Sequence, residues 1–206
     1  AQRISELVRS GVPLHEISVL YRAHYHSMEV QMELVKRNIP FDIRSGIRFF
    51  EQAHIKDVTS FMRVLVNPHD ELAWRRILMM YPKIGSVTFG KIWMKLSGED
   101  NPLESLIDES FAKTLPKSAQ NGVLLCRKNL LTLLTLDAPD RIPENIIDLL
   151  LNRCDYRIYL QEHYSDAASR EEDLIQLANF ASKFERMDDF LRELALLTNM
   201  SKEEEN

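Results

Sequence analysis

The spacing of apolar residues changes once along this chain, near Gly46, and the change limits the folds open to it. Before it, two short apolar runs, Ile17–Tyr21 and Phe41–Ile43, flank a segment with helical periodicity at residues 25–37. Such runs predict buried strands. Beyond Gly46, apolar residues recur at helical spacing almost throughout. We therefore expect a mainly α protein with a short α/β piece at its N-terminus.

The order strand, helix, strand in residues 1–44 predicts a βαβ unit, the building block of parallel sheets. Two strands cannot cover both faces of such a sheet. Residues 1–44 are therefore predicted to be one edge of a larger α/β domain, and residues 45–206 a separate helical domain. Because the chain lacks an initiator Met and opens within a predicted helix, residues 2–10, we expect a piece of a longer protein. The later predicted helices are 54–66, 71–81, 87–96, 102–110, 117–136, 143–152, 155–163 and 170–198, the last with a break near Met187.

Composition is ordinary for a soluble globular protein, with 45% hydrophobic and 28% charged residues. No apolar run approaches the length of a membrane span, and the N-terminus is too polar for a signal peptide. Cys126 and Cys154 are far apart and fit no metal-binding spacing. We expect two reduced, buried thiols in a cytoplasmic protein without membrane partners.

Charge is distributed unevenly along the chain, whose formal net charge is -5. Residues 1–43 are neutral, residues 44–96 carry nine basic and four acidic side chains, and residues 97–206 carry a net charge of -10. A basic middle suits the phosphates of a nucleic acid. Chance clustering on solvated helix faces remains open as the other explanation.

Residues Gly85–Ile92 match the P-loop pattern G-x-x-x-x-G-K and then depart from it. The pattern requires Ser or Thr after the lysine to hold Mg²⁺, and this chain has Ile92. A P-loop must also follow a buried strand, whereas residues 71–81 are predicted to be helical. The sequence therefore disfavours a P-loop enzyme.

The same residues suit a phosphate-binding turn between two helices. Gly85 would let a ligand approach the backbone, and the amides of Ser86, Val87 and Thr88 would begin the following helix, where anions are favoured. Lys83 and Lys91 would add positive charge. A plain helix–helix turn that contains a glycine is the alternative.

Several blocks then occur in a fixed order between Ile17 and Leu191. They are ISVLYRAHYHS (17–27), IPFDIRSGIRFFEQAHIKD (39–57), NPHD (67–70), PKIG (82–85), SREEDL (169–174) and FL (190–191). Their order, and above all the G-x-R-F-F-E-x-x-x-I-K-D block that begins at Gly46, resemble the UvrD/Rep-type superfamily 1 DNA helicases. The family has Asn at the position of His24, and Glu at the position of His54.

The resemblance implies that residues 1–44 end the RecA-like subdomain 2A and that residues 45–206 form the helical subdomain 2B. The parent would use ATP and Mg²⁺, whereas this piece, lacking the ATPase motifs, would hold no cofactor and catalyse nothing by itself. Its implied partners are DNA, the remaining helicase subdomains and an accessory protein.

The resemblance also assigns DNA contacts. Arg22 and His24 match positions that contact single-strand phosphates, and Arg48 and Lys56 match positions near the 2A–2B junction, where duplex enters. Gly85, Ser86 and Thr88 match the turn that grips the duplex backbone, and Lys83 and Lys91 join them as predicted contacts because of their charge beside that turn.

Structural alternatives remain for several of these residues. Arg22 could form a structural salt bridge, and Lys56 could be a solvated helix residue. Phe49 and Phe50 are expected to pack in the core, and the histidines form no recognisable ligand set.

Two functional hypotheses follow. The first is a DNA-binding, regulatory subdomain of an ATP-dependent 3′-to-5′ DNA helicase, which tunes unwinding by swivelling about the 2A junction. The second is a helical protein-interaction module whose docking face is the acidic C-terminal half.

Overall fold

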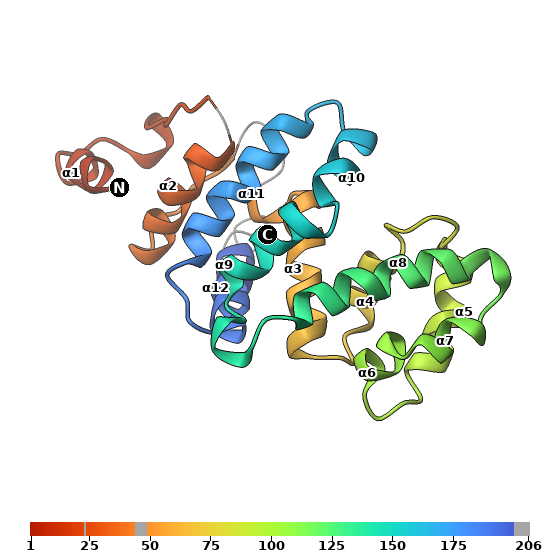
Figure 1. Ribbon diagram of the computed structural model, residues 1–206. Helices are drawn as coiled ribbons and strands as arrows, with labels where there is room; N and C mark the ends of the chain where they lie inside the picture. Colours follow the sequence, from red (N-terminus) through yellow and green to blue (C-terminus); the bar gives the residue numbers. More distant parts are fainter. Residues whose placement is uncertain (23, 44–48, 200–206) are drawn as a thin grey trace. The chain divides into compact units, whose positions relative to one another are not determined.

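The computed structural model describes residues 1–22, 24–43 and 49–199 (Figure 1). Every regular element in these ranges is a helix. Contacts divide the chain into two units, Ala1–Gln52 together with the residues from Glu193 onward, and Ala53–Arg192. The predicted domain boundary between residues 44 and 45 lies outside the described residues.

The first unit contains helices where helices were expected but no strands in its described part. Its elements are α1 (Gln2–Arg9), η1 (Leu14–Glu16), α2 (His24–Lys36) and η2 (Phe49–Glu51).

The two predicted strands were wrong for the residues that the structure describes, because neither Ile17–Tyr21 nor Phe41–Ile43 is assigned as a strand. Ile17 is extended, with φ -102° and ψ 125°, so the local conformation suits a strand. A strand also needs a neighbouring backbone for its hydrogen bonds, and the described residues provide none. Leu20, 94% exposed, is left without a covering layer.

The second unit contains the longer helices. They are α3 (Ala53–Val66), α4 (Glu71–Leu78), α5 (Ser86–Leu96), α6 (Pro102–Ile107), α7 (Glu109–Lys113), α8 (Lys117–Leu134), α9 (Pro143–Arg153), α10 (Tyr156–His163), α11 (Ala167–Ala181) and the beginning of α12 (Met187–Asn199), with a short η3 (Ala138–Asp140). The predicted mainly α fold is confirmed.

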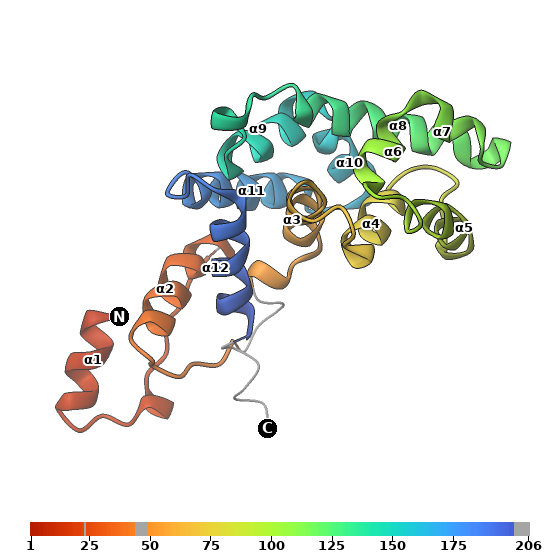
Figure 2. The same ribbon diagram turned by 90° about the horizontal axis from the view of Figure 1, so that it is seen from below.

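These helices form two groups that share α4 and α8. Helices α6 and α7 pack on α8, and α5 packs on α4 and α6, whereas α9, α10 and α11 pack on one another, and α9 and α11 pack on α3 (Figures 1 and 2). Trp74 on α4 and Leu130 on α8 are fully buried. These two helices therefore join the groups through the apolar core.

Short polar side chains set several of the helix boundaries. Asp70 accepts a hydrogen bond from the Ala73 amide at the start of α4, at 3.0 Å. Asp108 accepts one from the Ser110 amide and starts α7, so the single helix predicted over 102–110 is two. Side chains of this kind satisfy amides that have no partner within the helix. The predicted break near Met187 is confirmed, since α12 begins there.

Asp57 and Arg76 form a partly buried ion pair that joins α3 to α4. The Arg76 guanidinium donates to Asp57 Oδ1 at 2.6 Å, and the Tyr156 hydroxyl donates to Oδ2 at 3.0 Å. Burial raises the pKa of Asp57, while the charge of Arg76 and its hydrogen bond act in the opposite direction. The last residue of the I-K-D block is thus satisfied from two other helices.

A second buried contact joins α3 to α11. His54 is fully buried, and its Nδ1 lies 3.0 Å from Arg170 Nη1. A guanidinium only donates, so Nδ1 accepts and the ring proton is assigned to Nε2. Nε2 lies 3.2 Å from Oδ2 of Asp173, a buried carboxylate. The ring nitrogen Nε2 is therefore within ion-pair distance of the Asp173 carboxylate, although the two do not meet hydrogen-bonding geometry.

Other sequence expectations about the core are confirmed. Phe49 and Phe50 are buried, with their rings edge to face at 5.1 Å. Cys126 and Cys154 are free and buried, and burial raises the pKa of the Cys154 thiol to about 11. In the described ranges, no helix combines the length and the hydropathy that crossing a membrane requires.

Candidate nucleic-acid interface

The turn between α4 and α5 has a defined backbone geometry. The Tyr81 amide donates to Leu78 O, and the Ile84 amide donates to Tyr81 O. Lys83 takes the left-handed conformation, with φ 64°, which a residue other than glycine adopts at some cost. Ile84 turns into the core and is 4% exposed. The turn thus directs Lys83 to solvent while Ile84 holds it to the protein.

The N-terminus of α5 lacks a side-chain cap. Gly85 occupies the capping position with φ -95° and ψ -177°, and the first turn of α5 contains no acidic residue. By contrast, Asp70 and Asn101 accept hydrogen bonds from amides at the starts of α4 and α6. The exposed start of α5 therefore offers amide donors and the positive end of the helix dipole to an anion.

The sequence on either side of this turn carries charges of one sign. Residues 72–98 contain five basic side chains and no acidic one. Lys83 and Lys91 are exposed, as are Ser86 and Gly85, and Thr88 is half-buried. The structure thus gathers five sequence-predicted residues on the turn and the first half of α5.

Arg75 is a further basic residue at this site that sequence reasoning missed. Its Nη2 donates to the Ser86 hydroxyl at 3.4 Å, although 11 residues separate the two. Arg75 lies on α4 and is exposed. No short motif marks it, because the contact depends on how the turn folds α5 back towards α4.

Gly85 is not required by the fold. Its φ lies outside the left-handed region, and a Cβ built there has no neighbouring atom within 4 Å. A side chain at this position would therefore project into open space. Substitutions of Gly85 test ligand approach without disturbing the core.

The remaining predicted DNA contacts lie outside this turn along the chain. Lys56 is half-buried in the first turn of α3, and Arg22, exposed, lies before α2 in the first unit. His24 begins α2, but its side chain is outside the described part of the chain, as is all of Arg48.

The P-loop alternative does not fit the observed elements. The segment before Gly85 is the helix α4 followed by a turn, and not a strand. Ile92, which replaces the Mg²⁺-binding hydroxyl, is fully buried. In addition, the described residues contain no cluster of three or more His, Cys, Asp or Glu side chains that could hold a metal ion.

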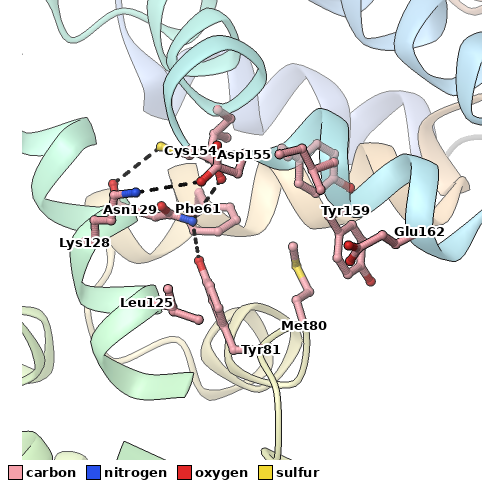
Figure 3. Close-up of a pocket in the computed structure, with 13 residues that line it drawn as sticks. Phe61, Met80, Tyr81, Leu125, Lys128, Asn129, Cys154, Asp155, Tyr159 and Glu162 are labelled. Atoms are coloured by element: carbon pink, nitrogen blue, oxygen red, sulfur yellow. Dashed lines mark hydrogen bonds and ion pairs between the residues drawn. The ribbon is translucent and has the colours of Figure 1, made fainter. Parts of the chain in front are cut away.

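A separate pocket of about 210 Å³ lies between α8, α10 and the residues Met80 and Tyr81 that follow α4 (Figure 3). Its lining is largely apolar and aromatic and includes Phe61, Tyr81 and Tyr159. The charged residues Lys128 and Glu162 also line it. None of the sequence-predicted DNA contacts lines it.

A helical domain with a basic, uncapped helix–turn–helix element is the class of protein that these features define. The chain belongs to the family of UvrD-like helicase C-terminal domains, which it matches over residues 1–206.

Individual relatives carry related names. The chain is 26% identical over 200 residues to the ATP-dependent DNA helicase Rep of Buchnera aphidicola, an alignment that covers 94% of the chain and 30% of the relative. It is 26% identical over 220 residues to the ATP-dependent DNA helicase PcrA of Bacillus subtilis, covering 100% of the chain and 30% of the relative. A probable DNA helicase II homolog of Mycoplasma capricolum is 38% identical over 92 residues, covering 45% and 13%. The chain thus spans less than a third of these relatives.

Proposed function

We propose that this chain is the DNA-binding, regulatory part of an ATP-dependent 3′-to-5′ DNA helicase of the UvrD/Rep type. Residues 45–206 are its 2B subdomain, and residues 1–44 are the end of a RecA-like 2A subdomain. The rest of the parent supplies ATP hydrolysis with Mg²⁺. The turn between α4 and α5 grips the phosphates of the duplex, and Arg22 and His24 contact the single strand.

The observation that carries the proposal is the basic, uncapped N-terminus of α5. Backbone amides there are free of side-chain caps, Arg75 reaches Ser86, and Lys83 and Lys91 lie in a stretch, residues 72–98, that contains no acidic side chain. Amides and flexible lysines recognise phosphate without reading bases. Binding at this turn is therefore indifferent to DNA sequence, as a protein that moves along DNA requires.

The first prediction concerns the salt dependence of duplex binding. With two to four phosphates neutralised, the slope of log K against log salt is roughly -2 to -4. Lys83→Ala removes one of these contacts and makes the slope less negative by about 0.9. Fluorescence anisotropy of a labelled hairpin duplex at several salt concentrations measures both values.

Lys183→Ala is the matched control for this experiment. Lys183 is an exposed lysine of the same unit and follows α11, a helix that packs on α3, α9 and α10. Its removal leaves the slope unchanged. Equal slopes for wild type and Lys83→Ala would count against the turn as the binding site.

The alternative function is a helical protein-interaction module that does not bind DNA directly. The pocket of Figure 3 favours it, because exposed Ile158 and Leu125 lie at an apolar hollow that a partner side chain could fill. Absence of duplex binding at low salt would support this alternative over the first proposal.

A further inference from the structure

Gly122, in the buried face of α8, lies directly against the turn. A Cβ built on it would lie 2.6 Å from the Pro82 carbonyl oxygen and 2.9 Å from Ile84 Cδ1. Both distances are shorter than real Cβ atoms show, and the first involves backbone that cannot rotate away. Any larger residue at this position must push the turn outward or deform α8.

The glycine has a cost that the fold accepts. Glycine in a helix interior is less favourable than alanine, because it loses more backbone conformational entropy on folding. Gly122 lies well inside α8 (Lys117–Leu134). Because Gly122 has no side chain, the turn can approach the axis of α8 closely.

A second contact from the same face of α8 holds the start of the turn. Asn129 follows Gly122 by seven residues, which is two helical turns. Its Nδ2 donates to the Tyr81 hydroxyl at 2.9 Å and lies 3.1 Å from Cys154 O (Figure 3). Tyr81 immediately precedes Pro82. Helix α8 therefore contacts this segment at two points. The turn packs closely against Gly122, and the Asn129 side chain forms a hydrogen bond with Tyr81.

The depth of the turn determines where the amides of α5 point. Ile84 is buried against Gly122, and the next residue, Gly85, is the first of the α5 N-terminus. A displacement of Ile84 also moves the Ser86 amide, because only Gly85, the capping residue of α5, lies between them.

We infer that Gly122 is a positioning residue for phosphate binding, which acts by seating the Pro82–Gly85 turn on α8. The inference rests on the proposed function of that turn. Gly122 itself touches no DNA. It sets the height and direction of the amide donors and of Lys83.

The test compares duplex binding by wild type and Gly122→Ala at several salt concentrations. We expect Gly122→Ala to weaken binding about tenfold at low salt, which is the loss of roughly one hydrogen bond to a charged group. The salt slope becomes less negative by about 0.9, because one phosphate contact is lost. Affinity is measured well below the melting temperature, which circular dichroism determines for each variant.

Two controls separate positioning from general destabilisation. Gly98→Ala is the matched glycine control, since the new Cβ meets only Lys95 O at an ordinary 3.8 Å. Ile147→Val removes one methylene from the core of α9 and lowers the melting temperature by about 2–4 °C. Both bind with the wild-type slope.

The outcomes distinguish the inference from the proposed function. If wild type does not bind the duplex, the proposed function and the inference both fail. If wild type binds and folded Gly122→Ala binds with the same affinity and slope, only the inference fails. Should Gly122→Ala not fold, Ile84→Ala takes its place. This variant weakens the packing of the turn on α8 without adding a clash. A wild-type salt slope in Ile84→Ala overturns the inference.

Discussion

Replacing Arg76 with Met lowers the free energy of unfolding by about 2–4 kcal/mol at pH 7, because a buried carboxylate loses its counter-ion. Asp57 has only 5% of its side chain exposed, and Tyr156 remains as its one other side-chain donor. The expected loss stays below that for a fully enclosed pair, since the Arg76 side chain is 36% exposed. Urea unfolding followed by circular dichroism measures it.

The pH dependence of this loss has a definite sign. Burial raises the pKa of Asp57 above its unfolded value of 3.8, and removing Arg76 raises it further. An acid with a raised folded pKa favours the folded state below the unfolded pKa, and this contribution is lost as pH rises through the folded pKa. The difference between Arg76→Met and wild type is therefore largest at neutral pH and shrinks as pH falls towards 3.8.

The double variant Asp57→Asn with Arg76→Met is the control. It removes the buried charge but keeps an oxygen for the Tyr156 hydroxyl, so it recovers stability relative to Arg76→Met. A loss from Arg76→Met that is independent of pH would show that packing of the Arg76 side chain, and not the charge of Asp57, stabilises this region.

His54→Leu lowers the free energy of unfolding by about 1–3 kcal/mol, because it leaves the buried Asp173 carboxylate without the imidazole beside it. Arg170 Nη1 also loses its acceptor, while Arg170 Nε stays paired with Asp166. Leu is close to His in volume, so the loss reports the polar groups and not a cavity.

Asp173→Asn in the His54→Leu background tests this explanation. With the charge removed, part of the loss is recovered, as chemical denaturation of the four proteins in the cycle measures. A loss below about 0.5 kcal/mol for His54→Leu would show that this cluster does not hold α3 to α11.

The helices were predictable wherever amphipathic periodicity and local capping agree. Helix α3 was expected over 54–66 and α10 over 155–163, and both are observed within a residue or two. Strands were not predictable in this way, because a strand forms only beside a neighbouring strand, which the local sequence does not specify. The split between α6 and α7 depends on a single capping carboxylate, Asp108, inside a pattern that periodicity treats as continuous.

The candidate site was predictable only in its contiguous part. Glycine, lysine and hydroxyl residues within Lys83–Lys91 indicate a phosphate-binding turn by their order along the chain. Arg75 and Gly122 reach the same place through the tertiary fold. The sequence does not reveal the partners of His54, because Arg170 and Asp173 lie more than a hundred residues away from it.

The most direct test of the phosphate-binding turn is an amide chemical-shift titration of the ¹⁵N-labelled chain with a short hairpin duplex at low salt. We expect the amides of Ser86, Val87 and Thr88 to shift most, and Gly85→Glu to abolish these shifts by placing a carboxylate where a phosphate binds. Gly85→Glu keeps the wild-type fold, since no atom lies within 4 Å of the new Cβ. Duplex binding that leaves these three amides unshifted, or that is equally strong in Gly85→Glu, would contradict the account.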